Sequence, residues 1–190
     1  MFVKIKILKN IFQQHKVFFI FLAKFILCYF VVTIVYSFYL NHYHTQNNEV
    51  DSITQFVAEQ TKNTLVFFGA DCEIIKHEFE PSYKVIYNSK YIARIVEGCN
   101  SVSVIILFAT FIFAFSNRFI ATFLYIFLGS ILIFILNIFR IALLTIGLYK
   151  YPEYGTFLHD ILFPLVIYGV VFLLWILWVI RFSLNKKQNG

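Results

Sequence analysis

Charge is scarce in this sequence. Charged residues make up 14% of the 190 residues, compared with about 25% in a typical soluble domain. Hydrophobic residues account for 60% of the chain, and the mean hydropathy is +0.76. So few polar residues cannot cover the surface of a small globule, which excludes an ordinary soluble domain and favours a lipid bilayer as the solvent.

Cysteine, glycine and proline are also few. The three cysteines, Cys28, Cys72 and Cys99, form neither a disulfide framework nor a CxxC pair. Seven glycines and three prolines leave no low-complexity linker between domains. His42 and His44 resemble half of a metal site, but no further cluster of histidine and cysteine completes it. We therefore predict no metal and no cofactor.

Apolar runs, in contrast, are long. Four of them could cross a bilayer, at residues 17–40, 100–116, 119–148 and 161–181. The first run is too long for the core of a cleaved signal peptide, and no small-residue cleavage site follows it. We expect Lys24, inside this run, to reach back toward the N-terminal side. The sequence therefore predicts an all-α integral membrane protein with about four transmembrane helices.

Residues 41–98 form the substantial polar region of the chain, and its character is mixed. Apolar residues recur at helical spacing between positions 53 and 65, which predicts an amphipathic helix. Runs rich in β-branched and aromatic residues, at 83–87 and 91–96, flank a polar turn and indicate a hairpin. Alternatively, residues 90–96 begin the next helix.

Cations set the predicted orientation. The formal net charge is +6, and the clustered cations flank apolar runs, which is typical of topology signals rather than of nucleic-acid binding. If the N-terminal lysines are cytoplasmic, four crossings also place Arg118 and the basic tail from Arg181 to Lys187 in the cytoplasm. Residues 41–98 and the loop at 149–160 then lie outside. We predict a multi-pass protein of the inner (cytoplasmic) membrane with both termini in the cytoplasm.

The last three apolar segments each carry one polar residue at a similar predicted depth. Measured along a helix from the cytoplasmic end of its own segment, Cys99 lies at about 27 Å, Arg140 at about 32 Å and His159 at about 33 Å. The hydrocarbon core is about 30 Å thick, so all three residues reach the outer interface. Equal depth does not by itself establish contact among them.

These three residue types together suffice for acyl transfer from a peptide bond. A thiol such as that of Cys99 becomes a good nucleophile as thiolate, a form that a nearby imidazole or guanidinium favours. His159 could protonate the leaving amine, and Arg140 could stabilise the oxyanion of a tetrahedral intermediate. A site at the outer surface would suit a substrate that is itself anchored in the membrane.

Each residue also has a structural interpretation. Cys99 could be a small packing residue, and Arg140 could be an anchor that reaches the interface from a helix end. Asn137, however, lies one turn deeper than Arg140 on the same helix face. Two polar residues stacked near a helix end favour a protein-facing or wet cavity over lipid contact.

Neighbouring residues allow more than one role as well. His159 and Asp160 could be a loop pair ahead of the last helix, with Asp160 as its N-cap. Glu97 could cap the second span or complement its N-terminal dipole. Cys72 could pair with Cys99 in an oxidising compartment, which would silence the nucleophile, although we prefer a free thiol.

Three short motifs resemble those of the exosortase/archaeosortase family. They are Glu97-Gly98-Cys99-Asn100-Ser101, Asn137-Ile138-Phe139-Arg140-Ile141 and His159-Asp160. Members of that family are polytopic membrane transpeptidases whose motifs occur in this order, each beside a membrane helix. The resemblance extends from Val96 to Phe182. In two respects the chain departs from many members: it has Ser101 where they have glycine, and it has fewer spans.

The resemblance implies Cys99 as nucleophile, Arg140 as the essential arginine and His159 as the acid/base. It also implies substrates with a C-terminal sorting signal, which consists of a short motif, a transmembrane helix and a basic cytoplasmic tail. The enzyme would cleave near the motif and hand the exported protein to an acceptor at the cell surface.

We therefore predict a membrane-embedded cysteine transpeptidase or protease whose site lies on the outer face. Its partners would be the sorting signals, the lipid bilayer and an unidentified acceptor, but no nucleic acid. The alternative is a non-enzymatic membrane subunit, with residues 41–98 as an external docking segment. A metalloprotease is a third interpretation, but the sequence lacks the metal ligands that such an enzyme needs. The residues predicted to support the site are Asn137, Glu97 and Asp160.

Overall fold

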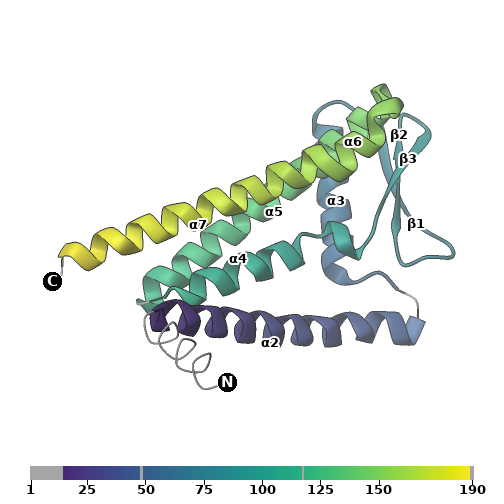
Figure 1. The fold of residues 1–190 in the computed structure, drawn as a ribbon. Helices are drawn as coiled ribbons and strands as arrows, with labels where there is room; N and C mark the ends of the chain where they lie inside the picture. The colour runs from purple at the N-terminus through teal and green to yellow at the C-terminus, as the bar shows by residue number, and fades with distance from the viewer. Residues whose placement is uncertain (1–14, 48, 117, 189–190) are drawn as a thin grey trace, which may run out of the picture.

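Figure 1 shows the computed structural model of the protein, which describes residues 15–47, 49–116 and 118–188. Lys4, Lys6 and Lys9, on which part of the predicted orientation rests, lie outside these residues.

Three helical stretches in the described part of the chain are long and apolar enough to cross a membrane. They correspond in position to the predicted spans at 17–40, 119–148 and 161–181. The helices in these stretches are α2 (Lys16–Asn47), α5 (Phe119–Lys150) and α7 (Phe163–Gln188). Their length and composition indicate a multi-pass membrane protein.

The predicted span at 100–116 is a shorter helix, α4 (Val102–Ala114). Its 13 residues extend about 20 Å, because a helix rises about 1.5 Å per residue, and this length falls short of a bilayer core of about 30 Å. The helix starts late because a 3-10 turn, η1 (Glu97–Cys99), precedes it and Ser101 has a left-handed backbone with φ of 63°. The prediction of about four spans is thus corrected to three long helices and a short one.

A small antiparallel sheet corrects the prediction of an all-α fold. Its strands are β1 (Cys72–Lys76), β2 (Tyr83–Tyr87) and β3 (Lys90–Ile95), in the order β1-β2-β3. Asn88 and Ser89 join β2 to β3 with φ of 48° and 61°, the left-handed pair that matches the twist of a tight hairpin. The predicted hairpin is confirmed, and the alternative in which this segment begins a helix is wrong.

The predicted amphipathic helix is α3 (Ser52–Phe67), and it packs on β1 and α5. Asp51 caps it, because the carboxylate accepts hydrogen bonds from the backbone N–H groups of Ile53 and Thr54. Its buried face joins the sheet in one core that also includes α5. The core residues from the three parts are Val57, Ala58, Leu65, Cys72, Val85, Tyr87, Ile95, Ile141 and Ala142. We call residues 51–95, which hold α3 and the strands, the sheet module.

The apolar helices run in roughly the same direction and spread apart toward the sheet module, which stands at one end of them (Figure 1). α4 packs against α2, α5 and α7, and α5 also packs against α7. Phe108 and Ile112 of α4, Ile133 of α5, and Val171 and Trp178 of α7 form their shared core. The chain returns from α5 to α7 at the end that carries the sheet module, through η2 (Pro152–Tyr154), α6 (Gly155–Phe157) and a π-helical turn, η3 (Leu158–Leu162).

Candidate active site

Cys99, Arg140 and His159 line one cavity of about 230 Å³. They come from three separate elements, since Cys99 ends η1, Arg140 lies on α5 and His159 lies on η3. Residues 92–95 of β3 and further residues of α5 complete the lining. The equal depth predicted from helix lengths is therefore accompanied by lateral proximity, which the sequence alone could not establish.

Hydrogen bonds hold the backbone of Cys99 on both sides. Its N–H donates to the carbonyl of Val96 at 2.8 Å, and its own carbonyl accepts from Nδ2 of Asn137 at 2.7 Å. The side chain is half-buried and its thiol is free. The sulfur is thus carried on a turn that is anchored to α5.

Asn137 connects Cys99 to Arg140. Its side chain is completely buried, and while Nδ2 holds the carbonyl of Cys99, Oδ1 accepts a long hydrogen bond of 3.4 Å from the Arg140 guanidinium. Buried amides need such partners, because an unsatisfied polar group away from water costs about 1–3 kcal/mol. Asn137 therefore links the backbone of Cys99 to the side chain of Arg140.

The guanidinium of Arg140 keeps unused hydrogen-bonding capacity. Its Nε is buried and has no hydrogen-bond partner, and no carboxylate forms an ion pair with it, among the residues that the structure describes. Arg140 as a whole is half-buried, but a buried donor atom such as its Nε normally has an acceptor. The cavity in front of Arg140 therefore favours an anionic or partly negative oxygen or sulfur.

His159 is oriented by its neighbour. Nδ1 lies 2.6 Å from Oδ1 of Asp160, so the other ring nitrogen, Nε2, is available for proton exchange. Asp160 lies inside the helical segment that runs from α6 into α7, and no side-chain cap bond is formed there. The interpretation of Asp160 as an N-cap is therefore wrong, and its contact is with the imidazole.

Asn100 is a buried residue whose role was not predicted. Its Nδ2 donates to the Tyr36 hydroxyl at 2.9 Å and to the Thr54 hydroxyl at 3.1 Å, and its Oδ1 accepts from the Val102 N–H at 3.0 Å. It thus ties α2 and α3 to the start of α4 directly after the candidate nucleophile. An asparagine just before an apolar run is a helix-start signal that could have revealed part of this role.

One prediction near the site is corrected, and one alternative is removed. Glu97 does not cap α4, since it belongs to the preceding η1 turn and Asn100 accepts from the first N–H of the helix. Glu97 instead lines a second pocket. Cys72 and Cys99 are both free, so the alternative disulfide is not formed. Cys72 is buried in the sheet module, and desolvation raises the pKa of its thiol.

The chain matches no model of a known protein family, no curated protein and no solved structure. Among the described residues, no group of three histidine, cysteine or acidic side chains is placed to hold a metal ion.

Proposed function

We propose that this protein is a membrane-embedded cysteine transpeptidase or protease, which cleaves the C-terminal sorting signals of membrane-anchored exported proteins. The observation that carries the proposal is the shared cavity of Cys99, Arg140 and His159. A thiol, an imidazole beside a carboxylate, and a guanidinium that forms no ion pair with the described residues are groups that suit acyl transfer.

In the proposed reaction, the sulfur of Cys99 attacks the carbonyl carbon of the scissile peptide bond while its proton passes to Nε2 of His159. The carbonyl oxygen becomes an oxyanion, which the Arg140 guanidinium stabilises. The C–N bond then breaks, and His159 returns the proton to the departing amine. Water or an acceptor amine attacks the resulting thioester, and the thiol of Cys99 is regenerated.

Asp160 and Asn137 act through these groups. Asp160 holds the Nδ1 side of His159, which keeps Nε2 directed at the reaction and stabilises the imidazolium. Asn137 keeps Arg140 beside the Cys99 turn through its two hydrogen bonds. Both are positioning residues rather than catalytic ones.

The proposed site lies on the outer face of the inner membrane. Support comes from the cations, since the start of α2 at Lys16, the turn before α5 at Arg118 and the part of α7 near Arg181 lie at the end of the helices away from the sheet module (Figure 1). Cationic flanks are typically cytoplasmic. The cavity is at the opposite end, where a membrane-anchored substrate would present its cleavage site.

Thiol labelling of the full-length protein in nanodiscs tests the proposal. We expect iodoacetamide to modify Cys99 at least about tenfold faster than Cys72, which is buried and has a raised pKa. His159→Ala and Arg140→Gln should both slow the labelling of Cys99, because they remove the proposed proton acceptor and the proposed anion-binding group from its cavity. Arg118→Gln, at the other end of α5, is the matched control and should leave the rate unchanged.

Processing in cells provides the second test. Cys99→Ala should abolish cleavage of a co-expressed protein that ends in a short polar motif, a transmembrane helix and a basic tail. Cleavage that continues in this variant would sink the proposal. Slow labelling of Cys99 that is insensitive to His159 would favour a non-enzymatic membrane subunit.

A further inference from the structure

Strand β3 has one free edge, and that edge borders the candidate site. Among the residues that the structure describes, the sheet has the order β1-β2-β3, so β3 pairs with β2 on one side only. Four consecutive residues of β3, from Ile92 to Ile95, line the cavity of Cys99. An edge strand presents unpaired N–H and C=O groups that can pair with another extended chain. These groups lie on the strand that leads directly into the η1 turn and its cysteine.

The two faces of β3 meet different surroundings. Ile95 is buried against Ile141 and Ala142 of α5, on the side of the helices. Arg94 directly precedes Ile95 in the strand. Successive side chains point to opposite faces, so Arg94 lies on the outer face. There it forms an ion pair with Glu80.

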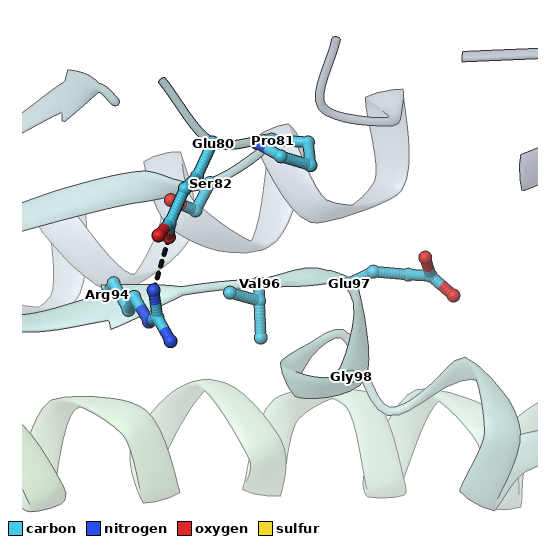
Figure 2. Close-up of a pocket in the computed structure, with 7 residues that line it drawn as sticks. All are labelled: Glu80, Pro81, Ser82, Arg94, Val96, Glu97 and Gly98. Atoms are coloured by element: carbon cyan, nitrogen blue, oxygen red, sulfur yellow. Dashed lines mark hydrogen bonds and ion pairs between the residues drawn. The ribbon is translucent and has the colours of Figure 1, made fainter. Parts of the chain in front are cut away.

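A second pocket, of about 490 Å³, lies on this outer face (Figure 2). Arg94 borders both the second pocket and the cavity of Cys99. Figure 2 shows Glu80 and Arg94 pointing toward each other, whereas Glu97 points away from this pair. The residues that line the pocket are Glu80, Pro81, Ser82, Arg94, Val96, Glu97 and Gly98.

We propose that the free edge of β3 is the docking strand for an extended segment of the peptide substrate. The segment adds as a fourth strand, and its main chain exchanges hydrogen bonds with β3. Its side chains then alternate between the cavity of Cys99 and the second pocket, because strands have a period of two. This inference rests on the function proposed above and deepens it by naming how the substrate is held.

The chemistry of the second pocket selects a polar, uncharged side chain. The hydroxyl of Ser82 is buried and has no hydrogen-bond partner within the part of the chain that the structure describes. Glu80 and Arg94 offset each other's charge, yet both can still accept or donate hydrogen bonds. A hydroxyl or carboxamide side chain would satisfy Ser82 without disturbing the ion pair.

Protection of Cys99 from alkylation measures docking on the intact protein. The probes are positional-scanning pools of capped octapeptides at millimolar concentration, and the readout is the rate of iodoacetamide labelling of Cys99. Pools with serine, threonine, asparagine or glutamine at one position should protect best. Failure of every pool to slow labelling would overturn the docking strand.

N-methylation of the best peptide then tests the strand pairing. Each amide is methylated in turn, and methylation at alternate positions should weaken protection by about tenfold, because only alternate N–H groups face β3. A uniform response along the peptide would contradict the proposal. This period-of-two pattern is independent of the identity of the side chains.

The pocket itself is tested with Ser82→Ala. This variant removes the unsatisfied hydroxyl and takes no hydrogen-bond partner from another buried group, so it should fold normally. It should reduce the preference for polar over apolar side chains at the selected position by about three- to tenfold, which is the value of one hydrogen bond. Ser37→Ala is the matched control, since this exposed hydroxyl donates to the carbonyl of Thr33 in its own helix and lines neither pocket. An unchanged preference in Ser82→Ala would remove the pocket from the proposal.

The two proposals fail in different ways. If labelling of Cys99 depends on His159 and Arg140 but N-methylated peptides protect as well as the parent peptide, the catalytic site stands and the docking strand falls. If labelling is insensitive to both residues, the proposed function falls, whatever the peptides do.

Discussion

The long helices and the sheet module differ in how far leucine and valine side chains are exposed. In α5 and α7, residues such as Leu128 and Leu165 are 63% and 67% exposed. In the sheet module, Val57, Leu65 and Val85 are completely buried. Exposed apolar residues of this size on long helices are stable where lipid is the solvent, whereas the module buries such residues in a core that it shares with α5. The candidate site lies where these two kinds of packing meet.

Replacing one leucine by alanine in each region should give the largest difference in the free energy of unfolding. Leu65→Ala removes a fully buried side chain from the module and should lower the free energy of unfolding by about 2–5 kcal/mol. Leu128→Ala removes a side chain that faces outward from α5, so we expect a much smaller loss. Thermal unfolding of both variants in the same lipid nanodiscs measures the difference. Equal losses would show that the outer face of α5 is packed against protein.

The junction between the regions should be sensitive to Asn137. Asn137→Ala leaves the carbonyl of Cys99 without its donor, which should cost about 1–3 kcal/mol, and it should also slow the labelling of Cys99. Thr110→Ala on α4 is the control, because its buried hydroxyl donates to backbone carbonyls of its own helix and does not line the cavity of Cys99. Labelling that is unaffected in Asn137→Ala would contradict a positioning role.

Within the helices, one glycine marks a close contact. A Cβ at Gly129 would lie 2.4 Å from the ring of Phe108, which is completely buried between α4 and α5. Gly129→Ala should therefore destabilise the protein by about 1–3 kcal/mol. Gly169→Ala on α7 meets nothing within 4 Å and should be neutral or stabilising by up to about 1 kcal/mol. Stability curves that shift alike for the two variants would refute this packing.

The smallest expected effect concerns the turn that begins α4. Ser101 has φ of 63° and its buried hydroxyl has no partner among the described residues, so Ser101→Gly should stabilise the protein by about 0.5–1 kcal/mol. Ser103→Gly, inside the helix, should lower stability by a similar amount. Chemical denaturation of the pair resolves the sign. Destabilisation by Ser101→Gly would mean that the serine hydroxyl has a role that its contacts do not reveal.

Much of the fold could be predicted from local pattern. Long apolar runs indicated the three long helices, and β-rich runs around Asn88 and Ser89 indicated the hairpin. Strand β1 was not predicted, because Cys72–Lys76 is short and shows no clear alternation of polar and apolar residues. Its pairing with β2 depends on residues farther along the chain. The length of α4 was overestimated, because no residue pattern around Ser101 indicates its left-handed backbone.

For the candidate site, the sequence by itself indicated which residues could carry the chemistry and predicted a similar depth for them. Helix rise converts residue counts into distance, and these counts predict one level for Cys99, Arg140 and His159, although Cys99 lies in the η1 turn just before α4. Only the tertiary structure decided that they share a cavity, because lateral position depends on how each helix is rotated and where its neighbours pack. The bonds of Asn137 and the free edge of β3 belong to this second kind of information, since both join segments that are far apart in the chain.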